Sequence, residues 1–260
     1  MSKEKLTIIK IGGNVIDTPE ILDRFLQDFS QMEGFKILVH GGGKEATRLA
    51  GKLGIETVMV DGRRVTDKEM LEVAVMTYAG LCNKKIVALL QKFDTQAIGL
   101  TGADGNSILS KKRETGSVDY GFVGDITGIN ADWIKSLLET GATPVFCAIT
   151  HDKKGQLLNT NADTVAQSLA VGLSPLFDIT LIYCFEKKGV LTDIHNEDSV
   201  IEELTLASYQ ELKEKNVIHS GMLPKLENCF QALQQGVKEI RIANPEIIAN
   251  PKVLHTHISM

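Results

Sequence analysis

The sequence has few aromatic residues and no long hydrophobic run. Phe, Trp and Tyr make up 5% of its 260 residues, and no window approaches the roughly 18 to 20 apolar residues that a membrane-spanning helix requires. Lysines precede the first apolar stretch, but Lys10 interrupts that stretch and no small-residue cleavage site follows. We therefore expect no membrane span, no secretory signal and a cytoplasmic location.

The sequence also lacks paired cysteines. Its four cysteines are scattered without a C-x-x-C spacing, at Cys82, Cys147, Cys184 and Cys229. Cys147 and Cys184 lie within apolar runs. Buried free thiols are expected rather than disulfides or a zinc site.

A strong charge of either sign is absent as well. The chain has 28 Lys and Arg against 33 Asp and Glu, a net charge of −5, which argues against a partner such as nucleic acid. Its 43% hydrophobic and 23% charged residues are typical of a globular protein and exclude disorder, collagen-like repeats and coiled coil. The length fits one large domain or two lobes.

The chain contains short β-branched runs that alternate with longer stretches of helical periodicity. This pattern predicts an α/β fold, with a parallel sheet buried between helices. The expected strands are 6–11, 36–39, 97–100, 144–148, 179–183 and 239–242. The expected helices are 19–32, 44–53, 68–93, 131–139, 163–171, 208–215 and 224–235. Residues 109–124 are expected to form turns or short hairpins on the sheet edge, and the turn 172–175 is the expected lobe boundary.

Two expected strands end in glycines. The first leads into Gly12-Gly13, and the second leads through His40 into Gly41-Gly42-Gly43, each before a helix. Glycine lets a ligand approach the backbone N–H groups, and ligands of open α/β sheets bind beyond the carboxyl ends of strands. A phosphate or carboxylate cradle is one interpretation, and two tight turns without a ligand are the other. The spacing matches neither a P-loop nor a G-x-G-x-x-G loop.

Several charged residues lie near these loops. Lys10 carries a charge inside an apolar strand. Its side chain either reaches solvent or has a function beside the anion cradle. Arg64 precedes a helix that Thr66 or Asp67 can cap, and it suits a small carboxylate substrate, although pairing with Asp61 competes.

The segment 159–163, N-T-N-A-D, also precedes a helix. Two roles are open for this segment. It either forms a turn and a helix cap, or it orients a substrate and a catalytic lysine. Lys225 lies beside a helix N-terminus, where a cation is unfavourable unless an anion binds there; a solvated surface lysine is the alternative.

Taken together, these motifs resemble those of the acetylglutamate kinases, which belong to the amino acid kinase superfamily with the carbamate, aspartate and uridylate kinases. The motifs are Lys10-x-Gly12-Gly13, His40-Gly41-Gly42-Gly43, Gly62-x-Arg64-Val65-Thr66-Asp67, Asn83-Lys84, Gly102-x-Asp104-Gly105, Val123-Gly124-Asp125, Asn159-x-Asn161-Ala162-Asp163 and Gly221-Met222-x-x-Lys225. They cover almost the whole chain in the family's order.

The resemblance implies a three-layer α/β/α sandwich with a mainly parallel sheet, the carbamate kinase-like fold. It implies a lobe 1–174 that binds the acylated amino acid and a lobe 175–260 that binds MgATP. The implied activity is ATP-dependent phosphorylation of the side-chain carboxylate of N-acetyl-L-glutamate, or a related N-acylglutamate, in arginine or ornithine biosynthesis. The alternatives are a superfamily kinase for carbamate or a free amino acid, and a catalytically silent amino-acid sensor.

The resemblance also assigns roles to residues. Lys10 and Lys225 would stabilise the transferred phosphoryl group, and Asp163 would orient both lysines. Substrate binding falls to Gly42, Gly43, Arg64 and Asn159. Nucleotide binding falls to Gly12, Gly13, Glu186, Lys187, Lys188, Gly189, Val217, Ile218 and His219. Mg²⁺ would arrive with ATP rather than on protein ligands.

The chain departs from the family pattern in places. The nucleotide loop reads F-E-K-K-G-V-L, whereas T-D-V-x-G-V-L is usual in the family. Glu186 therefore stands in place of an aspartate. The two lysines that follow it either contact phosphates or stay solvated. Residues 244–260 depart too. Arg63 stands where relatives are commonly apolar; it either pairs with an extra carboxylate on an acyl group such as succinyl or is a surface arginine. Only residues 1–5 precede the first strand, which predicts a homodimer insensitive to arginine.

Overall fold

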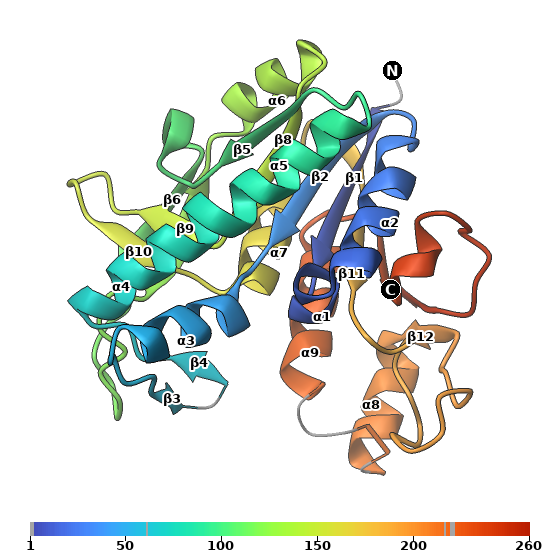
Figure 1. Ribbon diagram of the computed structural model, residues 1–260. Coiled ribbons are helices and arrows are strands. Elements are labelled where there is room, and N and C mark those ends of the chain that lie inside the picture. The colour runs from blue at the N-terminus through green and yellow to red at the C-terminus, as the bar shows by residue number, and fades with distance from the viewer. Residues whose placement is uncertain (1–2, 61, 216, 219–221) are drawn as a thin grey trace.

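The computed structural model describes residues 3–60, 62–215, 217–218 and 222–260. An eight-stranded sheet lies between two layers of helices (Figure 1). In spatial order its strands are β12 (Glu203–Thr205), β14 (Thr256–Ser259), β13 (Glu239–Ala243), β11 (Phe177–Cys184), β1 (Glu4–Ile11), β2 (Phe35–His40), β8 (Thr143–Cys147) and β5 (Ala97–Leu100). Only the β13–β14 pair among them is antiparallel in the described residues, so the expected α/β/α sandwich with a mainly parallel sheet is confirmed.

The two faces of the sheet build two cores. One face packs against α1 (Gly13–Asp17), α2 (Pro19–Ser30) and α5 (Asn83–Lys92). The other packs against α6 (Ala131–Glu139), α7 (Ala162–Leu173), α8 (Leu206–Glu214) and α9 (Leu223–Gln234). Because side chains alternate along a strand, Leu6 and Ile8 of β1 enter the second core while Ile9 and Ile11 enter the first. Lys10 therefore projects to the α7 and α9 side.

A smaller sheet and a hairpin lie beside the carboxyl edge of the central sheet. The small sheet has the order β10 (Leu157–Asn159), β9 (Ile149–His151), β6 (Ile108–Lys112) and β7 (Gly124–Ile129), and the hairpin is β3 (Met59–Val60) with β4 (Arg63–Arg64). The expectation of a hairpin on the edge of the main sheet was wrong in its placement. The strands β6 and β7 pair with each other and β6 also meets β9, which gives this segment a sheet of its own.

The long apolar helix is divided into three parts. It consists of α4 (Lys68–Ala74), a π-helical segment Val75–Cys82, which we call the π-segment, and α5. By length and composition alone Lys68–Lys92 is able to cross a membrane, which the sequence analysis did not single out. Here it packs on the sheet, where Ile86 and Leu90 are fully buried, so it serves as a core helix. With α3 (Gly43–Lys52), α4 also encloses a third, small core.

All six expected strands and all seven expected helices are confirmed to within two residues at each end. The four cysteines are free and buried as expected. The sequence analysis missed short elements, among them α1, β3, β4, β9, β10, β12, β14 and the 3₁₀ turns Asp104–Asn106 and Pro245–Ile247. The division into lobes at 172–175 stays a prediction, and β11 beyond that turn pairs directly with β1 along its length.

Candidate active site

Glycine loops and helix N-termini converge at one edge of the central sheet. Strands β1, β2 and β11 run parallel, so their carboxyl ends lie together, and α1 and α3 begin in the loops that follow β1 and β2. The start of α7 joins them, because a Cβ built on Gly41 would lie 3.7 Å from the Cβ of Ala162. This edge thus gathers backbone N–H groups and helix dipoles that favour an anion.

Two lysines and an aspartate meet at this edge. Lys10 Nζ lies 2.7 Å from Asp163 Oδ1, and Lys225 Nζ lies 3.3 Å from Asp163 Oδ2. The three side chains come from β1, the first turn of α7 and the first turn of α9. Each retains partial exposure, between 16% and 27%. The structure therefore brings together the three residues that the sequence analysis placed at the reaction centre.

The lysines control the charge of Asp163. Burial raises the pKa of this carboxyl, but the charges of Lys10 and Lys225 and their hydrogen bonds lower it further, so the pKa lies below its usual range. The carboxylate stays ionised and offsets the unfavourable position of Lys225 in the first turn of a helix. One negative charge faces two positive ones, which leaves net positive charge at this point.

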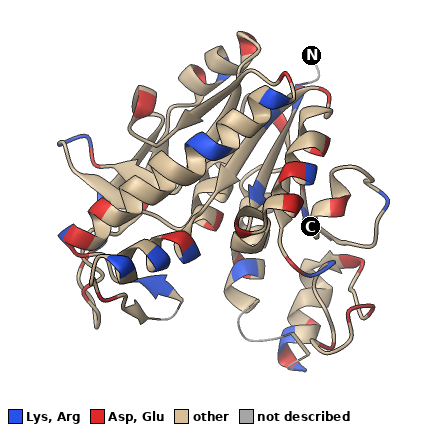
Figure 2. Ribbon diagram, in the orientation of Figure 1, with Lys and Arg blue, Asp and Glu red and all other residues tan. Residues whose placement is uncertain are grey.

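Positive charge is local in this molecule. Figure 2 shows acidic and basic residues interspersed over most elements, while the short strand β4 is basic along its whole length. The net charge of −5 cannot attract an anionic substrate by itself. The attraction must come from the lysine pair, the arginines and the helix N-termini at one edge of the sheet.

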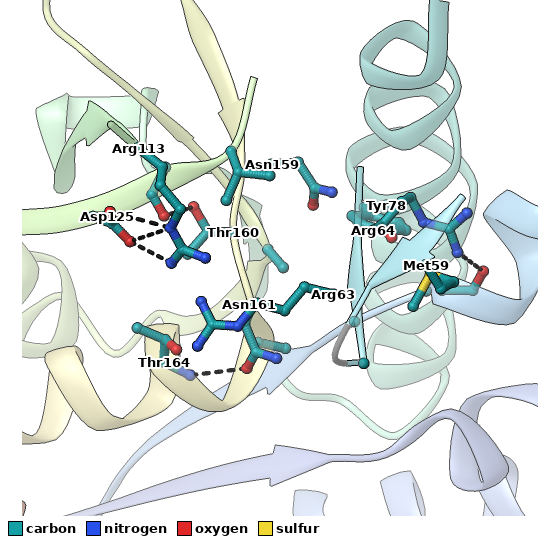
Figure 3. Close-up of a pocket in the computed structure, with 18 residues that line it drawn as sticks. Met59, Arg63, Arg64, Tyr78, Arg113, Asp125, Asn159, Thr160, Asn161 and Thr164 are labelled. Atoms are coloured by element: carbon teal, nitrogen blue, oxygen red, sulfur yellow. Dashed lines mark hydrogen bonds and ion pairs between the residues drawn. The ribbon is translucent and has the colours of Figure 1, made fainter. Parts of the chain in front are cut away.

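A cavity of about 210 Å³ adjoins this edge. It is lined by the glycine loop Gly41–Gly43, the β4 arginines, Tyr78, Arg113, Asp125 and residues Asn159 to Ala162, among others (Figure 3). The predicted substrate residues Gly42, Gly43, Arg64 and Asn159 thus all line one cavity. The volume suits a small polar molecule, and the lining combines cationic groups with amides and hydroxyls.

Arg64 fastens the glycine loop to β4. Its guanidinium is buried and donates to the Gly43 carbonyl (2.9 Å) and the Thr47 hydroxyl (2.9 Å). Asp67 in the same segment accepts from the Met70 N–H (2.8 Å) and caps α4. Asp61, the competing partner for the arginine, lies outside the described residues. The capping role expected for Asp67 is confirmed, and Arg64 holds the loop as well as facing the cavity.

The segment 159–163 forms the turn and helix cap that its sequence predicted. Asn161 caps α7 by accepting from the N–H groups of Asp163 (2.8 Å) and Thr164 (3.2 Å). Asn159 is buried and donates to the Thr66 hydroxyl (3.0 Å). The turn and cap are confirmed, and they set Asp163 in position for both lysines.

Arg113 and Tyr78 are among the lining residues that the sequence analysis missed. Arg113 donates to Asp125 from Nε (3.1 Å) across the β6–β7 hairpin, although only Asp125 belongs to a quoted motif. Tyr78 lies in the π-segment and is 5% exposed. Its pKa is raised by burial and lowered in part by Arg64. The sequence pattern placed Tyr78 only within the expected helix 68–93, so no local signal marked it as a site residue.

The predicted nucleotide residues are more dispersed. Gly12 donates to the Cys184 carbonyl (3.0 Å), which joins the β1 loop to the start of the 185–190 segment. Lys187 and Lys188 pair with Glu197 (2.7 Å) and Asp198 (2.6 Å) on the surface. These ion pairs agree with the interpretation that the two lysines stay on the solvated surface.

The remaining nucleotide residues have different surroundings. Glu186 lines a separate cavity of about 390 Å³ with Asn14 and Asn244. A Cβ on Gly189 would come within 2.5 Å of Thr256 Oγ1, so this loop is packed against the strand β14. Val217 is half-buried and Ile218 belongs to the larger core. His219 lies outside the described residues.

Comparison with known proteins gives one consistent family. The model of the amino acid kinase family matches residues 5–244. An acetylglutamate kinase of Phocaeicola vulgatus is 54% identical over 240 residues, which are 92% of this chain and 93% of that protein.

Solved structures agree with this result. The structure of smu.665 from Streptococcus mutans is 28% identical with a TM-score of 0.77, and the match covers 98% of both chains. Carbamate kinase from Giardia lamblia is 15% identical with a TM-score of 0.67 over 99% of both chains, which shows the fold. The chain belongs to the amino acid kinase family and, within it, to the acetylglutamate kinases.

Proposed function

We propose that this enzyme transfers the γ-phosphoryl group of ATP to the side-chain carboxylate of N-acetyl-L-glutamate, in arginine or ornithine biosynthesis. The observation that carries the proposal is the cluster of Lys10, Asp163 and Lys225, with ion-pair distances of 2.7 Å and 3.3 Å, beside a cavity lined by Gly41–Gly43 and Arg64. Kinases of this family use ATP, and we place its γ-phosphate at this cluster, beside the cavity for the acceptor.

The chemistry suits a site without a general base. A glutamate side chain has a reference pKa near 4.3, so the acceptor is already ionised at neutral pH. Its oxygen attacks the γ-phosphorus, the bond to the β-phosphate oxygen breaks, and ADP leaves. Lys10 and Lys225 neutralise charge on the transferred group, while Asp163 keeps both ammonium groups in place. Glycine N–H groups and Arg64 orient the acceptor.

We propose that Mg²⁺ binds mainly through the phosphates of ATP. The described residues contain no group of three or more His, Cys, Asp or Glu side chains placed to hold a metal ion, and Asp163 already pairs with two lysines. Mg²⁺ commonly keeps waters and phosphate oxygens as ligands. When bound, it supplies further charge neutralisation.

We propose that the nucleotide occupies the edge formed by Gly12, Gly13 and the 186–189 loop, with 217–219 beside it. The hydrogen bond from Gly12 to the end of β11 supports this position. Lys187 and Lys188 would have to exchange their acidic partners for phosphates to take part. Replacing both by Met leaves the KM for ATP unchanged if they remain solvated and raises it if they contact phosphate.

The substrate class is tested by measuring ADP release with N-acetylglutamate, N-succinylglutamate, glutamate, aspartate and carbamate. Turnover confined to N-acylglutamates supports the proposal. Turnover with carbamate or a free amino acid would assign the enzyme to another branch of the family. Absence of turnover with every acceptor would favour the silent sensor, which the presence of Lys10, Lys225 and Asp163 disfavours.

A second acceptor, an N-acylglutamate with an extra carboxylate such as N-succinylglutamate, is favoured by Arg63. This residue is exposed and lines the cavity, and Figure 3 shows it beside Asn161. Arg64 is engaged with the glycine loop and Arg113 with Asp125. Within the described residues Arg63 has no ion-pair partner, so it is the arginine best able to pair with a second carboxylate.

The acyl group is decided by kcat/KM for the acetyl and succinyl substrates in the wild type and in Arg63→Leu. A succinyl preference that falls about tenfold or more in the variant supports the pairing, by the usual strength of a charged hydrogen bond. Arg48→Leu, an exposed arginine on α3 that lines neither this cavity nor the one with Glu186, serves as the matched control. A clear acetyl preference that Arg63→Leu leaves unchanged contradicts it.

We also propose a homodimer that is located in the cytoplasm and is insensitive to arginine. Exposed apolar residues on the π-segment support association, since Met76 and Leu81 are 50% and 52% exposed, and a groove that includes Met76 and Phe122 adjoins them. Sedimentation equilibrium of the purified protein is expected to give twice the chain mass. A monomer, a hexamer or inhibition by arginine would contradict this proposal.

A further inference from the structure

His40 is a buried histidine that the proposed chemistry does not use. It is the last residue of β2 and is 0% exposed. Burial lowers its pKa to about 4, against a smaller raising effect of the Gly41 carbonyl and a further lowering by Lys84. The ring is therefore neutral near pH 7, and its burial keeps it from a substrate proton. Its two nitrogens instead join the glycine loop to α5.

The hydrogen bonds of His40 determine which nitrogen carries the proton. Nδ1 lies 2.7 Å from the Gly41 carbonyl, which can only accept, so Nδ1 is protonated and donates. Nε2 then accepts from the Asn83 amide Nδ2 at 3.0 Å. That amide also donates to the Val145 carbonyl at 2.9 Å, which fixes its orientation. Asn83 is 1% exposed, so both partners lie in a dry environment where such bonds are strong.

The hydrogen bond from His40 to the Gly41 carbonyl also sets the direction of the next backbone N–H. The peptide unit between Gly41 and Gly42 is planar and trans, so its C=O and N–H point in opposite directions. Because the C=O points at the His40 ring, the Gly42 N–H points away from it. Gly42 is buried and lines the cavity, and no acceptor for its N–H is present among the described residues. An N–H beside a cavity and without an acceptor in the chain is free to bind water or a ligand there.

The same helix holds the loop from a second direction. A Cβ on Gly42 would lie 2.6 Å from Tyr78 Cδ1 and 3.4 Å from Cys82 Sγ. Tyr78 and Cys82 belong to the π-segment, and Asn83 follows it directly. Wide π-turns inside α-helices occur frequently at functional sites. Three residues of one short stretch thus contact the loop or its histidine.

We propose that His40 and Asn83 are positioning residues: Asn83 selects the Nδ1–H form of His40, and His40 turns the Gly41–Gly42 peptide so that its N–H faces the carboxylate acceptor. Neither side chain contacts the substrate. The inference rests on the proposed function, because the ligand of the Gly42 N–H is taken to be the acylglutamate.

Two variants of similar polarity separate the positioning bond from the rest of the network. In His40→Asn the side-chain NH₂ takes the place of Nδ1 and keeps the bond to Gly41, while the contact with Asn83 is lost. In His40→Gln the NH₂ reaches the place of Nε2, and the bond to Gly41 is lost. We expect His40→Asn to keep the KM for N-acetylglutamate within about threefold, and His40→Gln to raise it about 10- to 100-fold, the range for losing an oriented hydrogen bond to a charged group.

The KM for ATP and the unfolding temperature serve as controls. A structural role alone would impair both variants in proportion to their loss of stability, and that outcome would overturn the proposal. Equal KM values in the two variants would also overturn it. If the wild type fails to phosphorylate any acylglutamate, the proposed function fails, whatever the variants do.

A spectroscopic measurement tests the proposal without activity or variants of His40. The ¹⁵N spectrum of histidine-labelled wild-type protein is expected to show a neutral Nδ1–H tautomer for His40 between pH 6 and 8. In Asn83→Asp, whose carboxylate at Nε2 can only accept a hydrogen bond, a ring protonated at Nε2 is expected to appear. A wild-type Nε2–H tautomer, or a ring that stays unprotonated at Nε2 in Asn83→Asp, would overturn the role of Asn83.

Discussion

Substituting Gly42 by alanine tests whether the fit between the glycine loop and the π-segment controls activity. The new Cβ would lie 2.6 Å from Tyr78 Cδ1, 3.1 Å from Cε1 and 3.4 Å from Cys82 Sγ. Carbon atoms rarely approach within 3.0 Å, so the loop or the ring must move by roughly half an ångström or more. Tyr78 is 5% exposed and the ring has little room to yield.

The expected effects follow from this displacement. Overpacking in a well-packed site typically costs about 1–3 kcal/mol of unfolding free energy. A misplacement approaching 1 Å near reacting groups lowers catalysis by about 10²-fold. We therefore expect Gly42→Ala to lower kcat/KM for the acylglutamate about 10²-fold, with a loss of stability of 1–3 kcal/mol measured by urea denaturation.

Gly51→Ala is the matched control. This glycine lies in α3, and a Cβ there would meet no atom within 4 Å. Alanine in a helix is more favourable than glycine by about 0.5–1 kcal/mol, so Gly51→Ala is expected to stabilise the protein and leave kinetics unchanged. In the double variant Gly42→Ala with Tyr78→Ala, the overpacking is relieved, so the loss of stability is expected to be smaller than the sum of the two single losses. Wild-type kinetics in Gly42→Ala would refute the reasoning.

Two further predictions concern ionisation. The pKa of His40 is about 4 in the folded protein and about 6.5 in the unfolded chain. Between these pH values the unfolded chain therefore binds more protons than the folded protein. The unfolding free energy is expected to fall by up to about 3 kcal/mol as the pH drops from 6.5 to 4. His40→Asn is expected to lack this His40 contribution, and an identical slope in both proteins would contradict it. Burial raises the pKa values of the four thiols, to about 11 for Cys82 and about 12 for Cys147, Cys184 and Cys229. A thiol reagent at pH 8 is therefore expected to label these cysteines only when the protein unfolds. Rapid labelling of the native protein would contradict this expectation.

The elements that could be predicted are those whose signal is local. Apolar runs of four to eight residues and helical periodicity marked the buried strands and long helices, because burial on both faces or on one face leaves a direct pattern. Strand β14 (Thr256–Ser259) escaped because a single large apolar residue, Ile258, anchors it in the core. The π-segment escaped because one wide turn leaves helical periodicity nearly intact.

The site shows the same division. The glycines at strand ends and Lys10 within an apolar strand are local anomalies in the sequence. Each of them lies at the carboxyl edge of the central sheet, where the site is. The bond between Arg113 and Asp125 and the contact between His40 and Asn83 join residues 12 and 43 positions apart. No pattern within one segment encodes such pairs, since the sheet and the helix packing bring them together.

The central claim is that Lys10 and Lys225, held by Asp163, stabilise charge on the phosphoryl group during transfer. The most direct test is kcat and KM for N-acetylglutamate and ATP in Lys10→Met and Lys225→Met, with Lys238→Met as a surface control, because Lys238 pairs with Asp178 away from the cleft. We expect kcat to fall by about 10²-fold or more in each of the two site variants, with both KM values changing much less and the control unaffected. An unchanged kcat with a raised KM would show that the lysine only binds substrate, and would contradict the account.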